Sequence, residues 1–387
     1  MGRIGSTVSR WTLAGGALLV AAAFSVAPVA SASVNSVKTC KSANGYKVSG
    51  PNAKQICSGL SFYRGKVLTF VAPDKPGGGF DQNARIYAPY LAQYLGATVV
   101  VSNIPAGNTV AGMNYVAGTN TSNPGLTVGW MNVGPIVEDK LLSITGVTFN
   151  AASEVMLGGT APDLSATAAI VSSACSAWDN GFGALLRANS ASNPVIELIQ
   201  TTGSTTFNML MIDGVFGIHY RAIAGYASSA DLVTGWNRGD GCVITDPVSV
   251  ISKFIAAGKA KALLVNVPLQ KNNEYYSSFV GVPTYLQAEK QFKSYIANKT
   301  QRAAAPVLNL AGNTERVFFA PPRTPKNLQA ALVAAFKWAS YNPNLMAQFR
   351  SIGQADGYVT GYTAKKDYNN YLNSARRVTE YLSAIGG

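Results

Sequence analysis

Residues 66–85, "KVLTFVAPDKPGGGFDQNAR", decide the fold class. An apolar run ends at Val71, and three consecutive glycines, Gly77 to Gly79, follow a few residues later. From Asp81 onward, apolar residues recur at the spacing of a helix. The stretch therefore predicts a strand over 66–71, a glycine-rich turn and then a helix, which is the building unit of α/β folds.

The same alternation continues along the chain. Helical periodicity predicts helices over 207–213, 229–234, 248–257 and 363–384, and Thr324 with Pro325 should cap and start another. Pro89 should kink the first helix. Apolar runs predict strands over 98–102, 127–131, 166–171, 195–198, 241–245 and 317–320.

Residues 1–32 have the pattern of a secretory signal peptide. Arg3 and Arg10 precede the apolar stretch 13–24, and Ala30-Ser31-Ala32 offers a cleavage site. The arginines are not adjacent, and no lipoprotein cleavage site precedes Cys40. We therefore expect an exported protein, located in the periplasm, the cell envelope or the extracellular medium.

Export makes the four cysteines candidates for disulfides. Of the three possible pairings we favour Cys40 with Cys57 and Cys175 with Cys242. No two cysteines have Cys-x-x-Cys spacing, and His219 is the single histidine, so we expect no metal site.

The chain is basic, with a formal net charge of +13. Six cations and no acid lie between Ser33 and Lys66, so residues 33–65 form a basic, cysteine-bounded extension. We favour a solvated or envelope-associated segment. Nucleic acid is not an expected partner, because the chain is exported and carries no basic helix or stacking motif.

Catalytic motifs are missing from the sequence. His219 has no serine or acid beside it, the chain contains no Walker motif, and Gly181-Phe182-Gly183 lacks the third glycine of a dinucleotide fingerprint. We therefore expect no enzyme and no cofactor.

Two loops suit the binding of an anion. The amides of Gly77, Gly78 and Gly79 precede a helix N-terminus, where the helix dipole also favours negative charge. Asp81 can cap that helix or receive a ligand's amine or hydroxyl. The loop Thr201 to Thr205 precedes the next predicted helix in a similar way. Either loop alone can be a plain turn or cap, but together they favour a small anion held between two α/β halves.

The sequence resembles the substrate-binding proteins of tripartite tricarboxylate transporters, the Bug-type extracytoplasmic receptors. Their pattern Pro-x-Gly-Gly-x-x-Asp corresponds to Pro76-Gly77-Gly78-Gly79-Phe80-Asp81. Two departures are Ser102 in place of a glutamate and Asn108 in place of a glycine. Further matching segments follow in family order at 99–108, 124–128, 219–224, 231–235, 282–286 and 320–325.

The resemblance implies a two-lobed, type II periplasmic-binding-protein fold, with lobe 1 at 66–158 plus 315–387 and lobe 2 at 159–314. It implies a small carboxylate bound in the cleft between the lobes, transporter permease subunits as partners, and a monomer. The alternative is a secreted sensory or interaction module of the same fold. The implied ligand-binding residues are Gly77, Gly78, Gly79, Asp81, Thr202, Gly203, Ser204 and Thr205, with Asp246 as a weaker wall residue.

Overall fold

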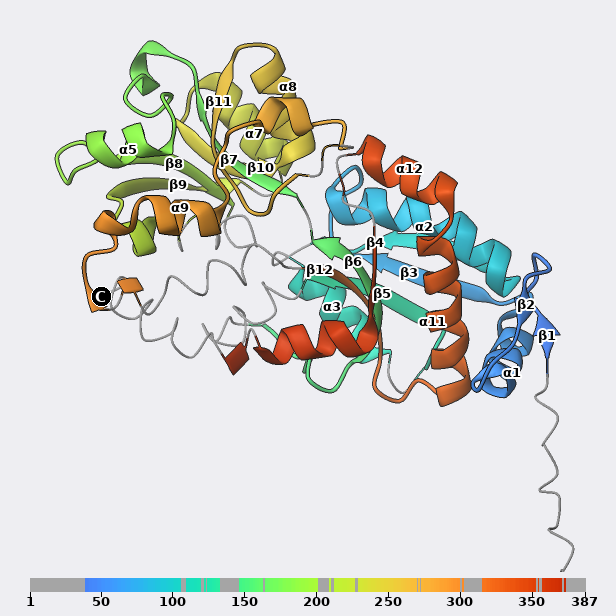
Figure 1. The fold of residues 1–387 in the computed structure, drawn as a ribbon. Coiled ribbons are helices and arrows are strands. Elements are labelled where there is room, and N and C mark those ends of the chain that lie inside the picture. Colours follow the sequence, from blue (N-terminus) through green and yellow to red (C-terminus); the bar gives the residue numbers. More distant parts are fainter. Residues whose placement is uncertain are drawn as a thin grey trace, which may run out of the picture. The chain divides into compact units, whose positions relative to one another are not determined.

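Two β-sheets organise the chain (Figure 1). The first has the strand order β13-β6-β12-β5-β3-β4, and β3 pairs in parallel with both β4 and β5. The carboxyl ends of these three strands therefore lie at one edge of the sheet. The strands are β3 (Val67–Ala72), β4 (Thr98–Asn103), β5 (Thr127–Asn132), β6 (Val155–Pro162), β12 (Glu315–Ala320) and β13 (Tyr358–Thr360).

The second sheet has the order β11-β7-β10-β8-β9. Its strand β8 pairs in parallel with β9 and β10, so this sheet also collects carboxyl ends at one edge. The chain passes from the first sheet to the second between Pro162 and Ser165. The strands are β7 (Ser165–Ile170), β8 (Val195–Gln200), β9 (Tyr220–Tyr226), β10 (Val243–Pro247) and β11 (Ala260–Val265).

Helices follow the strands in the order expected of an α/β protein. They are α1 (Ala53–Tyr63), α2 (Gly79–Leu95), α3 (Val110–Gly118), α5 (Phe182–Ala188), α7 (Ser229–Arg238), α8 (Val248–Ala256), α9 (Tyr285–Gln291), α11 (Lys326–Ser340) and α12 (Pro343–Ser351), with short 3₁₀ turns at Ser173–Cys175, Tyr276–Phe279 and Lys293–Tyr295. Residues 361–370 are also helical.

The computed structural model describes most of the chain, but the expected signal peptide (1–32) and the loop 201–208 lie outside the described residues. No described helix is both long and apolar enough to span a bilayer. The described residues are 39–105, 109–119, 122, 124–132, 146–162, 164–200, 209, 212–226, 229–269, 271, 273–299, 301–302, 315–352, 354, 357–370 and 372–373.

The strands predicted from apolar runs are confirmed, with ends shifted by one or two residues. Pro89 lies inside α2, which continues as one helix on both sides of it. The predicted cap of α11 is wrong, because Pro325 occupies the N-cap position and the helix begins at Lys326 without a side-chain cap. The lobe boundaries remain a proposal, with β6 extending past residue 158 in the first sheet.

An aromatic cluster fills one face of the first sheet. Phe318 of β12 lies 3.7 Å from the ring of Phe336 in α11 and 3.9 Å from Trp130 in β5. Tyr87 of α2 meets Phe318 edge to face at 4.8 Å. This face is covered by α1, α2, α11 and α12, so the cluster ties the strands to the helices that carry the first loop.

The N-terminal extension packs onto this helical layer. A small hairpin, β1 (Cys40–Lys41) with β2 (Lys47–Val48), leads into α1, which lies against α11 (Figure 1). Tyr63 is fully buried, and its hydroxyl donates a hydrogen bond to the Gly125 carbonyl at 2.6 Å. Since Val48, Ala53 and Leu60 are also buried, the expectation of a solvated segment is wrong for these apolar residues, while envelope association stays a prediction.

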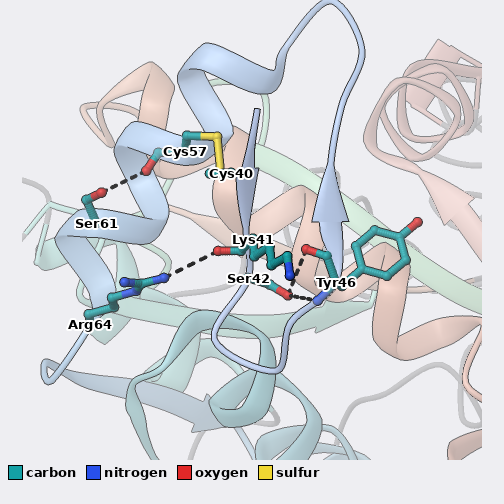
Figure 2. The surroundings of a disulfide bond; sticks show 7 residues. All are labelled: Cys40, Lys41, Ser42, Tyr46, Cys57, Ser61 and Arg64. Carbon is teal, nitrogen blue, oxygen red and sulfur yellow. Dashed lines mark hydrogen bonds between the residues drawn. A yellow bond between two sulfur atoms is a disulfide. The ribbon is translucent and has the colours of Figure 1, made fainter. Parts of the chain in front are cut away.

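Both predicted disulfides are present. Cys40–Cys57 joins the hairpin to α1, as Figure 2 shows. Cys175–Cys242 joins the turn after β7 to the residue before β10. Each bridge therefore joins two segments of the same part of the fold. It stabilises that part mainly by restricting the conformations of the unfolded chain.

The contact between α1 and α11 depends on Gly59. A Cβ atom at this position would lie 2.2 Å from the Asn327 carbonyl oxygen and 2.6 Å from the Ala331 side chain. We predict that Gly59→Ala lowers the free energy of unfolding by about 1–3 kcal/mol, because the two helices must move apart. The measurement is urea denaturation.

Gly118→Ala is the matched control for this prediction. Gly118 also lies in a helix, but nothing stands within 4 Å of its ideal Cβ position, so the control should be neutral or slightly stabilising. Equal effects of the two substitutions would show that the extension does not depend on this close contact.

Candidate functional site

The first loop, residues 73–78, is held by the carboxylate of Asp81, which is buried at the first turn of α2. Oδ2 accepts hydrogen bonds from the Gly77 amide (2.8 Å) and from Arg85 Nε (3.0 Å). Oδ1 accepts one from Asn103 Nδ2 (2.8 Å) at the end of β4. One buried charge thus joins the loop, the helix and the neighbouring strand.

Burial raises the pKa of Asp81, but the hydrogen bonds from Arg85, Gly77 and Asn103 outweigh it and leave the pKa below its usual value. Asp81 is therefore ionised at neutral pH. Its expected role of accepting a hydrogen bond from a ligand's amine or hydroxyl stays a prediction.

Gly77, Gly78 and Gly79 are each required for a different structural reason. Gly77 has φ of +85°, a conformation that side chains disfavour. A Cβ at Gly78 would lie 2.0 Å from Oδ2 of Asp74, and a Cβ at Gly79 would lie 2.7 Å from Nη2 of Arg316. The second and third glycines therefore make room for an anion and a cation that belong to the protein itself.

Arg316 is a charged residue beside the start of α2 that the sequence did not predict. It is only 6% exposed, and its guanidinium carbon lies 4.6 Å from the centre of the Phe80 ring. With its amide oxygen turned toward Arg316, Asn83 accepts a hydrogen bond from Nη1 (2.9 Å) and donates one to the Gly79 carbonyl (3.2 Å). Arg316 is the second residue of β12 and lies opposite Asn132 at the end of β5.

The protein's own groups accept hydrogen bonds from two of the three glycine amides that the sequence predicted would face a ligand. Gly77 donates to Asp81, and Gly78 donates to the Lys75 carbonyl at 3.0 Å. Asp74 accepts from the amides of Lys75 and Phe80. Burial raises the pKa of Asp74, although these amides and Arg316 act in the opposite direction.

The second sheet has a buried carboxylate at its own carboxyl edge. Asp246 ends β10 almost fully buried, and Ser229 Oγ at the start of α7 lies 2.9 and 2.8 Å from its two oxygens. Burial raises the pKa of Asp246 to about 7, while the Ser229 hydrogen bond lowers it. The other predicted residues of this half, Thr202, Gly203, Ser204 and Thr205, lie outside the described residues.

One ion pair connects the first loop to α7. Lys75 Nζ lies 3.6 Å from Asp231 Oδ2, two residues after Ser229. Both side chains are about half exposed, so the pair contributes little to stability. The pair shows, however, that the first loop lies beside α7, the helix whose Ser229 hydrogen-bonds to Asp246.

The two cavities found on the described surface lie away from these groups. One of about 540 Å³ is lined by Val67, Tyr115 and Leu126, among others, and one of about 300 Å³ by Phe182, Arg187 and Phe292. Within the described ranges, no three His, Cys, Asp or Glu side chains gather as metal ligands. The candidate site therefore rests on the groups at the carboxyl edges of the two sheets.

A buried carboxyl group of the second sheet interacts with a buried carboxyl group of a helical segment. Glu197 lies in the middle of β8, and Asp213 lies in the helical segment 212–216. Burial raises the pKa of Glu197 to about 7, against the hydrogen bond with Asp213. Burial and then the adjacent Glu197 hold the pKa of Asp213 well above its usual range. A proton shared between them lets both be buried near neutral pH.

No protein-family model matches the chain, and no curated protein is significantly similar to it. Several solved structures do match. The periplasmic binding protein BugD is 17% identical, with 84% of this chain and 99% of BugD covered and a TM-score of 0.63. MatC from Rhodopseudomonas palustris with bound malate is 13% identical, with 80% and 98% covered and a TM-score of 0.62.

A further R. palustris protein, solved with adipate, is 16% identical, with 82% of this chain and 97% of that one covered and a TM-score of 0.63. At these identities the likeness establishes the fold. The chain has the α/β architecture of periplasmic binding proteins, as the sequence resemblance implied.

The Asp81 network should make stability depend on pH. A lowered folded-state pKa adds stability above the unfolded pKa, and this stability is lost as pH falls. We predict that Asp81→Asn costs about 1 kcal/mol of unfolding free energy near pH 7, a modest value because Arg85 is half exposed. The cost should shrink toward about pH 3, because pH then lies below the unfolded aspartate pKa of about 3.9 and approaches the lowered folded-state value.

Urea denaturation at both pH values measures this difference. Asp179→Asn, which lies outside this network, is the control, and its substitution should have the same small effect at both values. A cost of Asp81→Asn that does not change with pH would contradict the ionic account of the loop.

The pair Glu197 and Asp213 should have the opposite pH dependence. A raised folded-state pKa gives stability that is present at low pH and lost as pH rises through the folded value. For Glu197 that value is about 7. We predict that the melting temperature falls between about pH 4.5, near the unfolded pKa of a glutamate, and about pH 7, and that Glu197→Gln flattens this fall.

Thermal unfolding monitored by circular dichroism gives the measurement, and Glu289→Gln in α9 serves as the control. Parallel pH profiles for the wild type and Glu197→Gln would rule out the shared proton.

Proposed function

We propose that this chain is an extracytoplasmic solute-binding protein that captures a small carboxylate and delivers it to a tripartite tricarboxylate-type membrane transporter. The fold shared with BugD and with the malate-bound and adipate-bound proteins supports the binding role. Two disulfides are compatible with export to an oxidising compartment. Binding rather than catalysis also agrees with the absence of catalytic motifs in the sequence.

The observation that carries the proposal is the placement of Arg316. A buried guanidinium beside the N-terminus of α2 sits where the helix dipole is already positive, so the region favours anions. Arginine matches the planar geometry of a carboxylate with its paired donors. We infer that Arg316 joins Gly77, Gly78, Gly79 and Asp81 in the carboxylate site.

The second half of the proposed site comprises Thr202, Gly203, Ser204, Thr205 and Asp246. Hydroxyl and amide donors complement a carboxylate without adding charge. Asp246, held by Ser229, supplies a polar wall that accepts a hydroxyl or amine from the ligand. This division of roles favours acids that carry a second polar group.

Thermal shift measurements test the binding role. Dicarboxylates, tricarboxylates, aromatic acids and amino acids are compared, each acid against its amide. A bound acid at about 100 times its dissociation constant adds roughly 2.7 kcal/mol of stability, and its amide should add nothing. If no acid raises the melting temperature, the proposed function is wrong.

A binding acid then allows a test of Arg316. We predict that Arg316→Gln weakens binding by about 10- to 100-fold in calorimetry, since a hydrogen bond to a charged group is lost. Gly79→Ala should also weaken binding, because its new Cβ displaces the guanidinium without removing the charge.

Lys261→Gln on β11 is the control for this change of net charge, and its affinity should equal that of the wild type. An unchanged affinity of Arg316→Gln would remove Arg316 from the site, while the acid-specific thermal shift would still support the function.

A further inference from the structure

The N-terminal part of the described chain has an uncompensated positive surface. Between residues 39 and 73 every charged residue is a cation, and all of these side chains are exposed. We call them the basic face: Lys41, Lys47, Lys54, Arg64 and Lys66.

The fold brings three of these cations, Lys41, Lys47 and Arg64, together on a fixed support. Lys41 and Lys47 are direct partners across the β1–β2 hairpin, so their side chains emerge on the same side. Arg64 Nη2 donates to the Lys41 carbonyl at 3.3 Å and therefore lies beside the hairpin (Figure 2). Cys40–Cys57 and the buried Tyr63 hold the whole segment against the first sheet's helices.

This arrangement has an energetic cost in the isolated protein. Like charges directly opposite each other on paired strands repel. The helix α11, which packs on α1, does not offset this charge, because it carries Lys326 and Lys337 and no acid. An anionic partner would remove this repulsion.

Apolar side chains are exposed among the cations. Tyr46 is 54% exposed, Phe62 is 37% exposed and Val67 is 55% exposed. Tyr46 precedes Lys47, and Phe62 and Val67 flank Arg64 and Lys66. Cations interleaved with exposed aromatic residues are typical of surfaces that lie in a membrane interface.

We propose that the basic face docks the protein on a bilayer rich in anionic phospholipid. The cations are spread over a hairpin, a helix and the following turn, and none is buried in a pocket, so they suit many anionic headgroups more than one small anion. The exposed aromatic rings add contact with the interface. This role is independent of ligand binding.

Vesicle flotation of the exported protein tests the proposal, with the same N-terminus verified by mass spectrometry for every variant. Vesicles of phosphatidylcholine alone are compared with vesicles containing about 30% phosphatidylglycerol. We expect at least about tenfold stronger binding to the anionic vesicles at low salt, lost near 0.5 M NaCl because the charges are screened.

The double variant Lys47→Glu with Lys54→Glu should bind the anionic vesicles at least about tenfold more weakly. Lys259→Glu with Lys261→Glu changes the net charge equally on the second sheet, where both lysines are exposed, and should bind like the wild type. Phe62→Ser should bind several-fold more weakly with the same salt dependence.

Three results would overturn the proposal. The first is equal binding to both kinds of vesicle. The second is equal loss in the two charge-reversal variants, which would show that only net charge matters. The third is retention by immobilised polyphosphate without vesicle binding, which would assign the basic face to a soluble polyanion.

Discussion

The first half of the candidate site depends on keeping the buried charge of Asp81 fully hydrogen-bonded. An ionised carboxylate is costly to bury unless donors surround it. Here the donors come from three directions: Gly77 in the loop, Arg85 one turn along α2, and Asn103 at the end of β4. Satisfying this charge therefore fixes the entry of α2 relative to the sheet edge. The positions of Asp74 and Arg316 around Gly78 and Gly79 follow from that entry angle.

This constraint changes how the glycine-rich loop is understood. A run of glycines before a helix suggests amides waiting for an anion, yet the protein's own Asp74 and Asp81 accept hydrogen bonds from the loop. Positive charge at the same place comes from Arg316 and Arg85. The edge is thus an alternating set of charges close to neutrality, and a carboxylate that binds there has to compete with internal anions. Such competition is a physical basis for selectivity among acids.

Local patterns predicted the repeating part of the fold and failed where distant residues meet. The period of apolar residues around Val71 and Asp81 predicted β3, the turn and α2, and export with the cysteine count led to both disulfide pairs. Arg316 was missed because its contact with Gly79 joins residues far apart in the chain. The sequence did not predict the burial of Tyr63, because the many cations of this segment make the apolar stripe of α1 hard to recognise. Pro325 at the start of α11 shows the usual uncertainty of one residue at helix ends.

The two disulfides differ in what they leave free. One closes a loop within the N-terminal segment, and the other closes a loop within the second sheet and its preceding turn. No covalent cross-link among the described residues spans from one sheet to the other. Each disulfide therefore constrains only the part of the fold that it closes, so reduction should destabilise each part without removing any link between the two sheets.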